Sequence, residues 1–236
     1  MTGRIVAFEG LDGSGKSTQV SLLLDRLRAT GVEHEYISFP RTEEPGYGEA
    51  IAMFLRGEFG AVEDVSPYLI ASLFAGDRAA AKPLLDTWLQ SGKLVVADRY
   101  FYSNLAFQSA KLLGSAKKQH FRAWLRQVEF GCHRIPPAAL TVFFDVPFAF
   151  VQSNIIHQRP QEVRSYLNGH PDIHETALDL QERVAVEYRS LAADDSSFCT
   201  ISCADVAGQM RTVQDIHQEV TRLLEVHELV CEPRKS

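Results

Sequence analysis

Cysteine, basic charge and long apolar runs are all scarce in this sequence. The four cysteines form no CxxC pair and lie beside no Cys-His set, so we expect reduced thiols rather than disulfides or a zinc site. Lysine and arginine number 24 against 30 acidic residues, and the net charge of −6 argues against sequence-independent binding of nucleic acid. No apolar run reaches the roughly 18 residues of a membrane span, and the first residues lack a secretory signal's apolar core. We therefore expect a cytoplasmic protein with no membrane or nucleic-acid partner.

The remaining composition is that of a globular protein. The 236 residues are 45% hydrophobic and 23% charged, and without an internal repeat or linker they predict a single domain over residues 1–236. Short β-branched runs alternate with helical patterns at residues 16–31, 66–90 and 209–227, and Pro83 could interrupt the second of these. The runs lie at residues 4–9, 35–39, 93–98, 140–146 and 197–202. This alternation predicts an α/β fold, a five-stranded parallel sheet flanked by helices, with ligands at the carboxyl ends of its strands.

The strongest motif lies between the first predicted strand and the first predicted helix. Residues 10–17, GLDGSGKS, fit the pattern G-x-x-x-x-G-K-[ST] in the strand–helix context that gives the pattern its meaning. The glycines let backbone N–H groups face phosphate oxygens, Lys16 is expected to reach the β- and γ-phosphates, and the Ser17 hydroxyl is expected to bind Mg²⁺. The predicted ATP-binding residues are Gly10, Leu11, Asp12, Gly13, Ser14, Gly15, Lys16, Ser17 and Thr18. The motif leaves the phosphoryl acceptor open.

A second polar motif, Asp98-Arg99-Tyr100, follows the third predicted strand. An acid in this place fits the carboxylate that holds Mg²⁺ in P-loop enzymes, often through water. An adjacent arginine can clamp a phosphate with a two-pronged hydrogen bond. The position at a strand's carboxyl end favours these roles over a surface ion pair.

Four segments in order resemble the thymidylate kinase family: FEGLDGSGKST, FPRTEEPGYG, SLFAGDR and DRYFYSNLAFQ. The resemblance extends from Arg4 to about the last helix and implies a P-loop kinase with a mobile lid at about residues 157–175. It also implies ATP-dependent phosphorylation of dTMP to dTDP in dTTP biosynthesis, Mg²⁺ as cofactor, and a homodimer. Two alternatives stay open, namely a related P-loop kinase acting on another nucleoside or nucleotide, and a P-loop switch that signals to a protein.

The resemblance further assigns roles to single residues. It implies that Asp12 accepts a hydrogen bond from the 3′-hydroxyl of dTMP, and that Arg41 and Arg99 bind phosphates. Phe74 would stack on thymine, while Arg78 would donate to its O4. Asn104 and Gln108 would meet the base edge. Phe107 stands where many bacterial members have Tyr. These three residues, with Phe39 and Tyr166, complete the implied dTMP site.

The implied catalytic set depends on the lid. Because Gly13 leaves the P-loop without the arginine of one family branch, the resemblance implies that Arg159 and Arg164 supply positive charge from the lid. With Lys16 and Arg99 they make up the implied catalytic residues. His170 and His174 are four residues apart, but a pair without a third ligand favours solvated side chains over a metal site.

Overall fold

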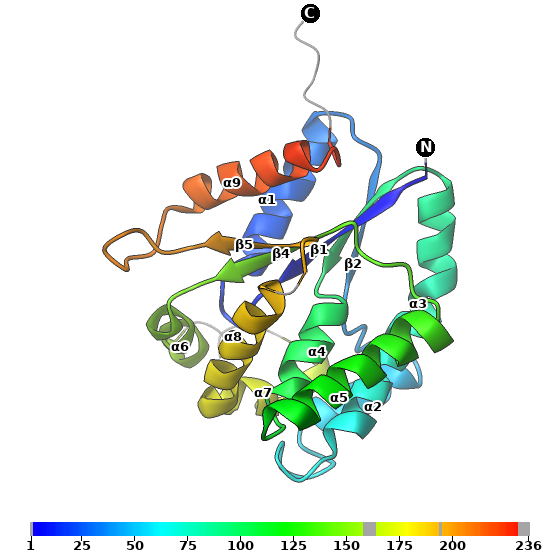
Figure 1. The fold of residues 1–236 in the computed structure, drawn as a ribbon, viewed down its shortest axis with the longest axis vertical. Helices are drawn as coiled ribbons and strands as arrows, with labels where there is room; N and C mark the ends of the chain where they lie inside the picture. The colour runs from blue at the N-terminus through cyan, green and yellow to red at the C-terminus, as the bar shows by residue number, and fades with distance from the viewer. Residues whose placement is uncertain (1, 158–163, 194, 231–236) are drawn as a thin grey trace, which may run out of the picture.

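The computed structural model describes residues 2–157, 164–193 and 195–230. Within them, five strands form one sheet in the order β2-β3-β1-β4-β5, and every neighbouring pair is parallel (Figure 1). Their bounds are β1 Arg4–Glu9, β2 His34–Ser38, β3 Leu94–Asp98, β4 Leu140–Asp145 and β5 Phe198–Ser202. The predicted fold class is confirmed, and each strand lies within one residue of its expected bounds.

Helices cover both faces of this sheet. Helices α1 and α9 pack together on one face, while α4 and α8 pack together on the other (Figure 1). The α-helices are α1 Lys16–Ala29, α2 Tyr47–Leu55, α3 Pro67–Gln90, α4 Phe101–Ser109, α5 Ser115–Arg126, α6 Phe148–His157, α7 Ile173–Thr176, α8 Leu178–Ala192 and α9 Val213–Val226. A π-helical turn, η1 Gln127–Cys132, extends α5, and a 3₁₀ turn, η3 Ser165–Leu167, precedes α7.

The central strand shows why the chain folds in this way. In β1, Ile5, Val6, Ala7 and Phe8 are all buried, since a parallel strand covered on both faces has no solvent-facing side. Residues 5–8 can therefore all be apolar, and the strand ends at the buried acid Glu9, just before the P-loop. The same arrangement in β3 leaves Asp98 and Arg99 beside the P-loop.

Two predicted helices differ from the observed ones. Helix α3 runs without interruption through Pro83, so the expected break does not occur. Helix α9 begins at Val213 rather than near 209, because the Thr212 hydroxyl caps it by accepting a hydrogen bond from the Asp215 amide at 3.1 Å.

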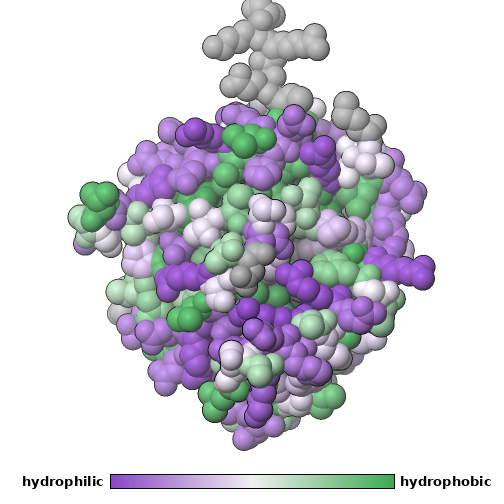
Figure 2. Space-filling model, in the orientation of Figure 1, coloured by the Kyte–Doolittle hydropathy of each residue, from purple (hydrophilic) through white to green (hydrophobic). Residues whose placement is uncertain are grey.

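Hydrophilic side chains cover most of the face seen in Figure 1, with hydrophobic ones scattered among them (Figure 2). Among the helices of the described residues, none combines the length and the apolar character that a membrane crossing needs.

Candidate functional site

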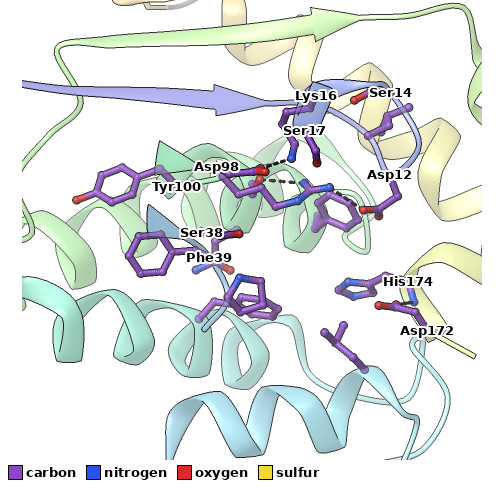
Figure 3. A pocket seen from close by; sticks show the side chains of 18 of the residues that line it. Asp12, Ser14, Lys16, Ser17, Ser38, Phe39, Asp98, Tyr100, Asp172 and His174 are labelled. Atoms are coloured by element: carbon purple, nitrogen blue, oxygen red, sulfur yellow. Dashed lines mark hydrogen bonds and ion pairs between the residues drawn. The ribbon is translucent and has the colours of Figure 1, made fainter. Parts of the chain in front are cut away.

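A cavity of about 370 Å³ lies at the carboxyl ends of the strands, the edge at which the sequence places its motifs. The P-loop forms one part of its wall, and Asp98 lies beside it at the end of β3 (Figure 3). Arg99, the next residue, also lines the cavity. Helices α3 and α4 and the segment 166–174 complete the wall. The cavity thus joins a phosphate-binding loop to a pocket lined by aromatic and amide side chains.

In the P-loop, Gly13 and Gly15 adopt φ values of 73° and 80°, a region that L side chains rarely enter. Gly15 precedes α1, which begins at Lys16 and carries this residue's side chain into the cavity. The Lys16 ammonium donates to the Asp98 carboxylate, and both side chains are buried. Burial lowers the pKa of Lys16, while the Asp98 charge acts in the opposite direction. This loop therefore holds a desolvated cation where a triphosphate would lie.

Arg99 is held in place by a turn in the backbone after β3. Its φ is 65°, and its amide donates to the Phe8 carbonyl at 2.9 Å. Its guanidinium donates to Asp12 at 2.7 Å and to the Ser103 hydroxyl at 3.1 Å. Burial acts to lower the pKa of Arg99, but Asp12 and other negative groups raise it above its ordinary value. Arg99 thus stays a fixed positive charge inside the cavity.

Glu9 is buried at the end of β1 but does not line the cavity. Its carboxylate accepts hydrogen bonds from the amides of Tyr100 and Ser103, at 3.0 and 3.1 Å, and from the Tyr188 hydroxyl at 2.9 Å. These contacts hold the start of α4 against the sheet. The geometry therefore favours a structural role for this acid over a catalytic one.

The other end of the cavity has the character of a base-binding pocket. Phe39, Phe74 and Phe107 contribute aromatic surface, and Arg78, Asn104 and Gln108 contribute polar groups. The Arg78 guanidinium is fully buried and lies 5.9 Å from the Phe39 ring centroid. A flat apolar slot with a few fixed polar groups is the usual form of a site for a planar ligand.

The segment after α6 adds three residues to the cavity wall: Tyr166, Asp172 and His174. The Tyr166 hydroxyl lies 3.2 Å from the Asp172 carboxylate, whose pKa burial raises to about 7. The His174 ring lies 5.1 Å from those of both Phe54 and Phe107. The expectation of a solvated His174 is therefore wrong, because its ring is buried against these two aromatic rings, with the Lys111 Nζ 3.2 Å from its Nε2.

Comparisons with known proteins agree with this geometry. The thymidylate kinase family model matches residues 8–130. A thymidylate kinase from Mycobacterium tuberculosis is 33% identical over 192 residues, which cover 80% of this chain and 86% of the relative. A probable thymidylate kinase from Pyrococcus horikoshii is 31% identical over 234 residues, covering 98% of this chain and 99% of the relative. The chain belongs to the thymidylate kinase family.

A solved structure of the family shares the fold. The thymidylate kinase of Candida albicans superimposes with a TM-score of 0.70 at 21% identity, over 98% of this chain and 96% of that one. The match extends over almost the entire length of both chains. The five-stranded sheet and its flanking helices are therefore the architecture of thymidylate kinases.

Most residues that the motifs and the family resemblance predicted come together in the cavity of this thymidylate kinase family member. Gly10, Arg41 and Arg164 do not line it. Arg159 lies outside the described residues. Those that do line it are Leu11, Asp12, Gly13, Ser14, Gly15, Lys16, Ser17, Thr18, Phe39, Phe74, Arg78, Asp98, Arg99, Asn104, Phe107, Gln108 and Tyr166.

Two of the implied arginines contact acids instead. The Arg41 side chain donates to the carboxylate and the backbone carbonyl of Asp77, both at 2.9 Å. The Arg164 guanidinium lies 2.7 Å from the Glu175 carboxylate. Either side chain would have to leave its partner to reach a phosphate in the cavity.

Sequence reasoning missed several residues that line the cavity or contact its wall. Asn154 of α6 donates to the Gly13 carbonyl at 2.7 Å and so braces the P-loop. Gln181 of α8 donates to Asp12 at 2.8 Å, and Asp172 and His174 lie on the wall itself. No motif marks these residues, since each is brought to the site by packing of a distant segment.

The donor atoms beside the P-loop fit a magnesium ion. Among the described residues, no group of three or more His, Cys, Asp or Glu side chains could hold a metal. The Ser17 hydroxyl and the Asp98 carboxylate both line the cavity. Mg²⁺ typically takes one or two protein oxygens and completes its shell with phosphates and water, so a set this small suits a metal that arrives with a nucleotide.

Proposed function

We propose that this protein transfers the γ-phosphoryl group of ATP to the phosphate of dTMP, which yields ADP and dTDP. The observation that carries the proposal is the single cavity in which a P-loop faces a base-sized aromatic pocket across Arg99. The relatives named above as thymidylate kinases support the same substrate pair.

The reaction needs positioning and charge neutralisation more than a strong base. The attacking phosphate oxygen of dTMP is already ionised near neutral pH, so no residue must remove a proton from it. Lys16 and Arg99 place positive charge where the transferred group would pass. Asp12, already bonded to Arg99 at 2.7 Å and to Gln181 at 2.8 Å, would hold the sugar of the acceptor.

Nucleotide binding would rearrange one ion pair. Lys16 contacts Asp98 in the structure, and a triphosphate offers it a more highly charged partner. Ser17 and Asp98 would then hold Mg²⁺, which when bound neutralises charge on the β- and γ-phosphates. Lys16 would then contact the phosphates, and the Asp98 carboxylate would contact the metal ion.

We also propose that residues 157–175 form a lid on a single domain spanning residues 1–236. The described part of this segment supplies Tyr166, Asp172 and His174 to the cavity wall, so its position controls access to the site. Closure would exclude water, which otherwise competes with dTMP for the phosphoryl group. Arg159 and Arg164 are the arginines that such a lid would bring to the transferred group.

Assembly as a homodimer and a cytoplasmic location complete the proposal. The homodimer rests on the family resemblance, and the location rests on the sequence, which has neither a membrane-length apolar run nor a secretory signal's apolar core. The thiols of Cys132, Cys199 and Cys203 are free, as a reducing compartment requires. Light scattering coupled to size exclusion measures the oligomer directly, and a mass of one chain at micromolar concentration would contradict the dimer.

A coupled assay for ADP, run with and without dTMP, tests the activity. We expect turnover that depends on dTMP, a preference over dUMP of a few-fold to tenfold from one buried methyl group, and a much larger preference over dCMP. A best rate with dCMP or AMP would support a kinase for another acceptor. Slow ATP hydrolysis that no acceptor stimulates would support a nucleotide-dependent switch.

A further inference from the structure

A fully buried carboxylate, Glu129, lies behind the base end of the cavity without lining it. It belongs to the π-helical turn η1. The Arg78 guanidinium donates to it through Nε at 2.7 Å and also through Nη2. The Asn104 amide nitrogen donates to it at 3.1 Å. One acid thus contacts Arg78 and Asn104, two of the three polar groups that the resemblance places at the base.

These contacts determine which way the Asn104 amide faces. An ionised carboxylate and a backbone carbonyl can only accept hydrogen bonds. Glu129 and the Ala71 carbonyl, which lies 3.0 Å from Asn104 Nδ2, therefore require the nitrogen to face them. The oxygen, Oδ1, is left on the other side of the amide, buried and without a hydrogen-bond partner among the described residues. Asn104 lines the cavity, so a base that reaches this amide meets an acceptor and no donor.

Arg78 presents the opposite polarity. A guanidinium has five N–H groups and no acceptor, and Glu129 engages only Nε and Nη2. The remaining N–H groups belong to a side chain that also lines the cavity. The wall therefore pairs a donor from α3 with an acceptor from α4.

This order matches one class of pyrimidine. Thymine and uracil present an acceptor, O4, beside a donor, N3–H. Cytosine presents the reverse, an amine beside an N3 acceptor. Its amine donor would face the Arg78 donor, and its N3 acceptor would face the Asn104 acceptor. A buried polar group left without a partner is the strongest basis for rejecting a ligand.

We propose that Glu129 is the positioning residue that sets this donor–acceptor order and so makes the pocket select a base with O4 and N3–H. The inference rests on the proposed function, because it assumes that the acceptor base binds at this end of the cavity. It adds a residue that touches no substrate and acts through Arg78 and Asn104.

The test compares kcat/KM for dTMP and dCMP in the wild type and in Glu129→Gln. A glutamine can donate toward Asn104, so Asn104 is no longer forced to present its oxygen. We expect the dTMP/dCMP ratio to fall at least tenfold, with the loss for dTMP mainly in KM. The matched control is Glu187→Gln, which changes an equally buried acid, paired with Lys118 at 2.5 Å and Arg122 at 2.7 Å, outside the cavity. Its ratio should stay unchanged.

Two further measurements keep the inference testable if Glu129→Gln fails to fold. Glu129→Asp retains an acceptor-only group and should keep the dTMP/dCMP ratio within about threefold of the wild type. The wild type should also use N3-methyl-dTMP at least a hundredfold less efficiently than dTMP, because the methyl group removes the donor that Asn104 needs.

The outcomes separate the inference from the proposed function. An unchanged ratio in a folded Glu129→Gln protein would overturn the role of Glu129, as would efficient use of N3-methyl-dTMP, or a Glu129→Asp protein without dTMP preference. In each of these cases a wild type that turns over dTMP leaves the proposed function intact. A wild type that does not phosphorylate dTMP would instead refute the proposed function.

Discussion

The buried ion pair between Lys16 and Asp98 predicts that a P-loop substitution changes stability as well as turnover. Lys16→Met leaves the Asp98 carboxylate buried, with 9% of its side chain exposed, and without its cation. Breaking a buried pair from one side costs about 3–5 kcal/mol. The cavity admits some water, so we expect the low end, about 3 kcal/mol. For a chain of this length that lowers Tm by about 6–12 °C.

A second substitution separates stability from catalysis. Asp98→Asn in the Lys16→Met background removes the unpaired charge, so most of the lost Tm should return. The rate should not return, because Lys16 acts on the transferred phosphoryl group, and its removal is expected to lower kcat by at least about 10², or about 2.7 kcal/mol of barrier. Calorimetric melting and the coupled ADP assay measure the two effects on the same preparations.

Two results would refute this reasoning. A Tm within about 2 °C of the wild type in Lys16→Met would mean that the pair contributes little to folding. A double variant with near-normal turnover would mean that Lys16 acts on Asp98 rather than on the nucleotide. Binding of ATP to each variant, measured by calorimetry, shows whether a lost rate reflects lost affinity.

Three other predictions give separate tests. Arg164→Ala should lower kcat by about 10³ or more, while the dTMP affinity measured by calorimetry changes little. A kcat within about threefold of the wild type would mean that residues 157–175 only cover the site. Gly13→Ala should cost more stability than Gly15→Ala: both incur about 1–2 kcal/mol for a positive φ, but a Cβ at Gly13 would also lie 3.1 Å from the Asn154 Cβ, whereas the space at Gly15 is open. Burial lowers the pKa of Lys111 to about 7 from 10.5, so the unfolded chain binds more protons between these values and stability should rise with pH there, by at most about 1.4 kcal/mol per unit. Lys111→Met should flatten that slope in urea titrations at pH 7 to 9, and an unchanged slope would contradict the assignment.

The local features of this protein were readable from its sequence. The P-loop is a contiguous stretch whose glycines, lysine and serine each have a role that depends on nearest neighbours. The central strands β1, β3 and β4 were found to within one residue because a parallel strand buried on both faces is apolar along most of its length. The edge strands β2 and β5 have exposed positions, and their signal is the short run of β-branched and aromatic residues. The edge of the sheet that holds the cavity followed from the same pattern, since the polar residues come directly after β1 and β3.

The pairings across the site were decided by the tertiary structure. Lys16 and Asp98 are 82 residues apart, and Arg78 and Glu129 are 51 apart, and nothing in either local sequence identifies the partner. The sequence predicts a solvated His174, whereas the fold packs Phe54 of α2 and Phe107 of α4 against its ring. The sequence pattern indicates which side chains must be buried, because burial follows from the spacing of apolar residues along a helix or strand. It does not report which buried charges meet, because that depends on how helices distant in sequence pack on one sheet.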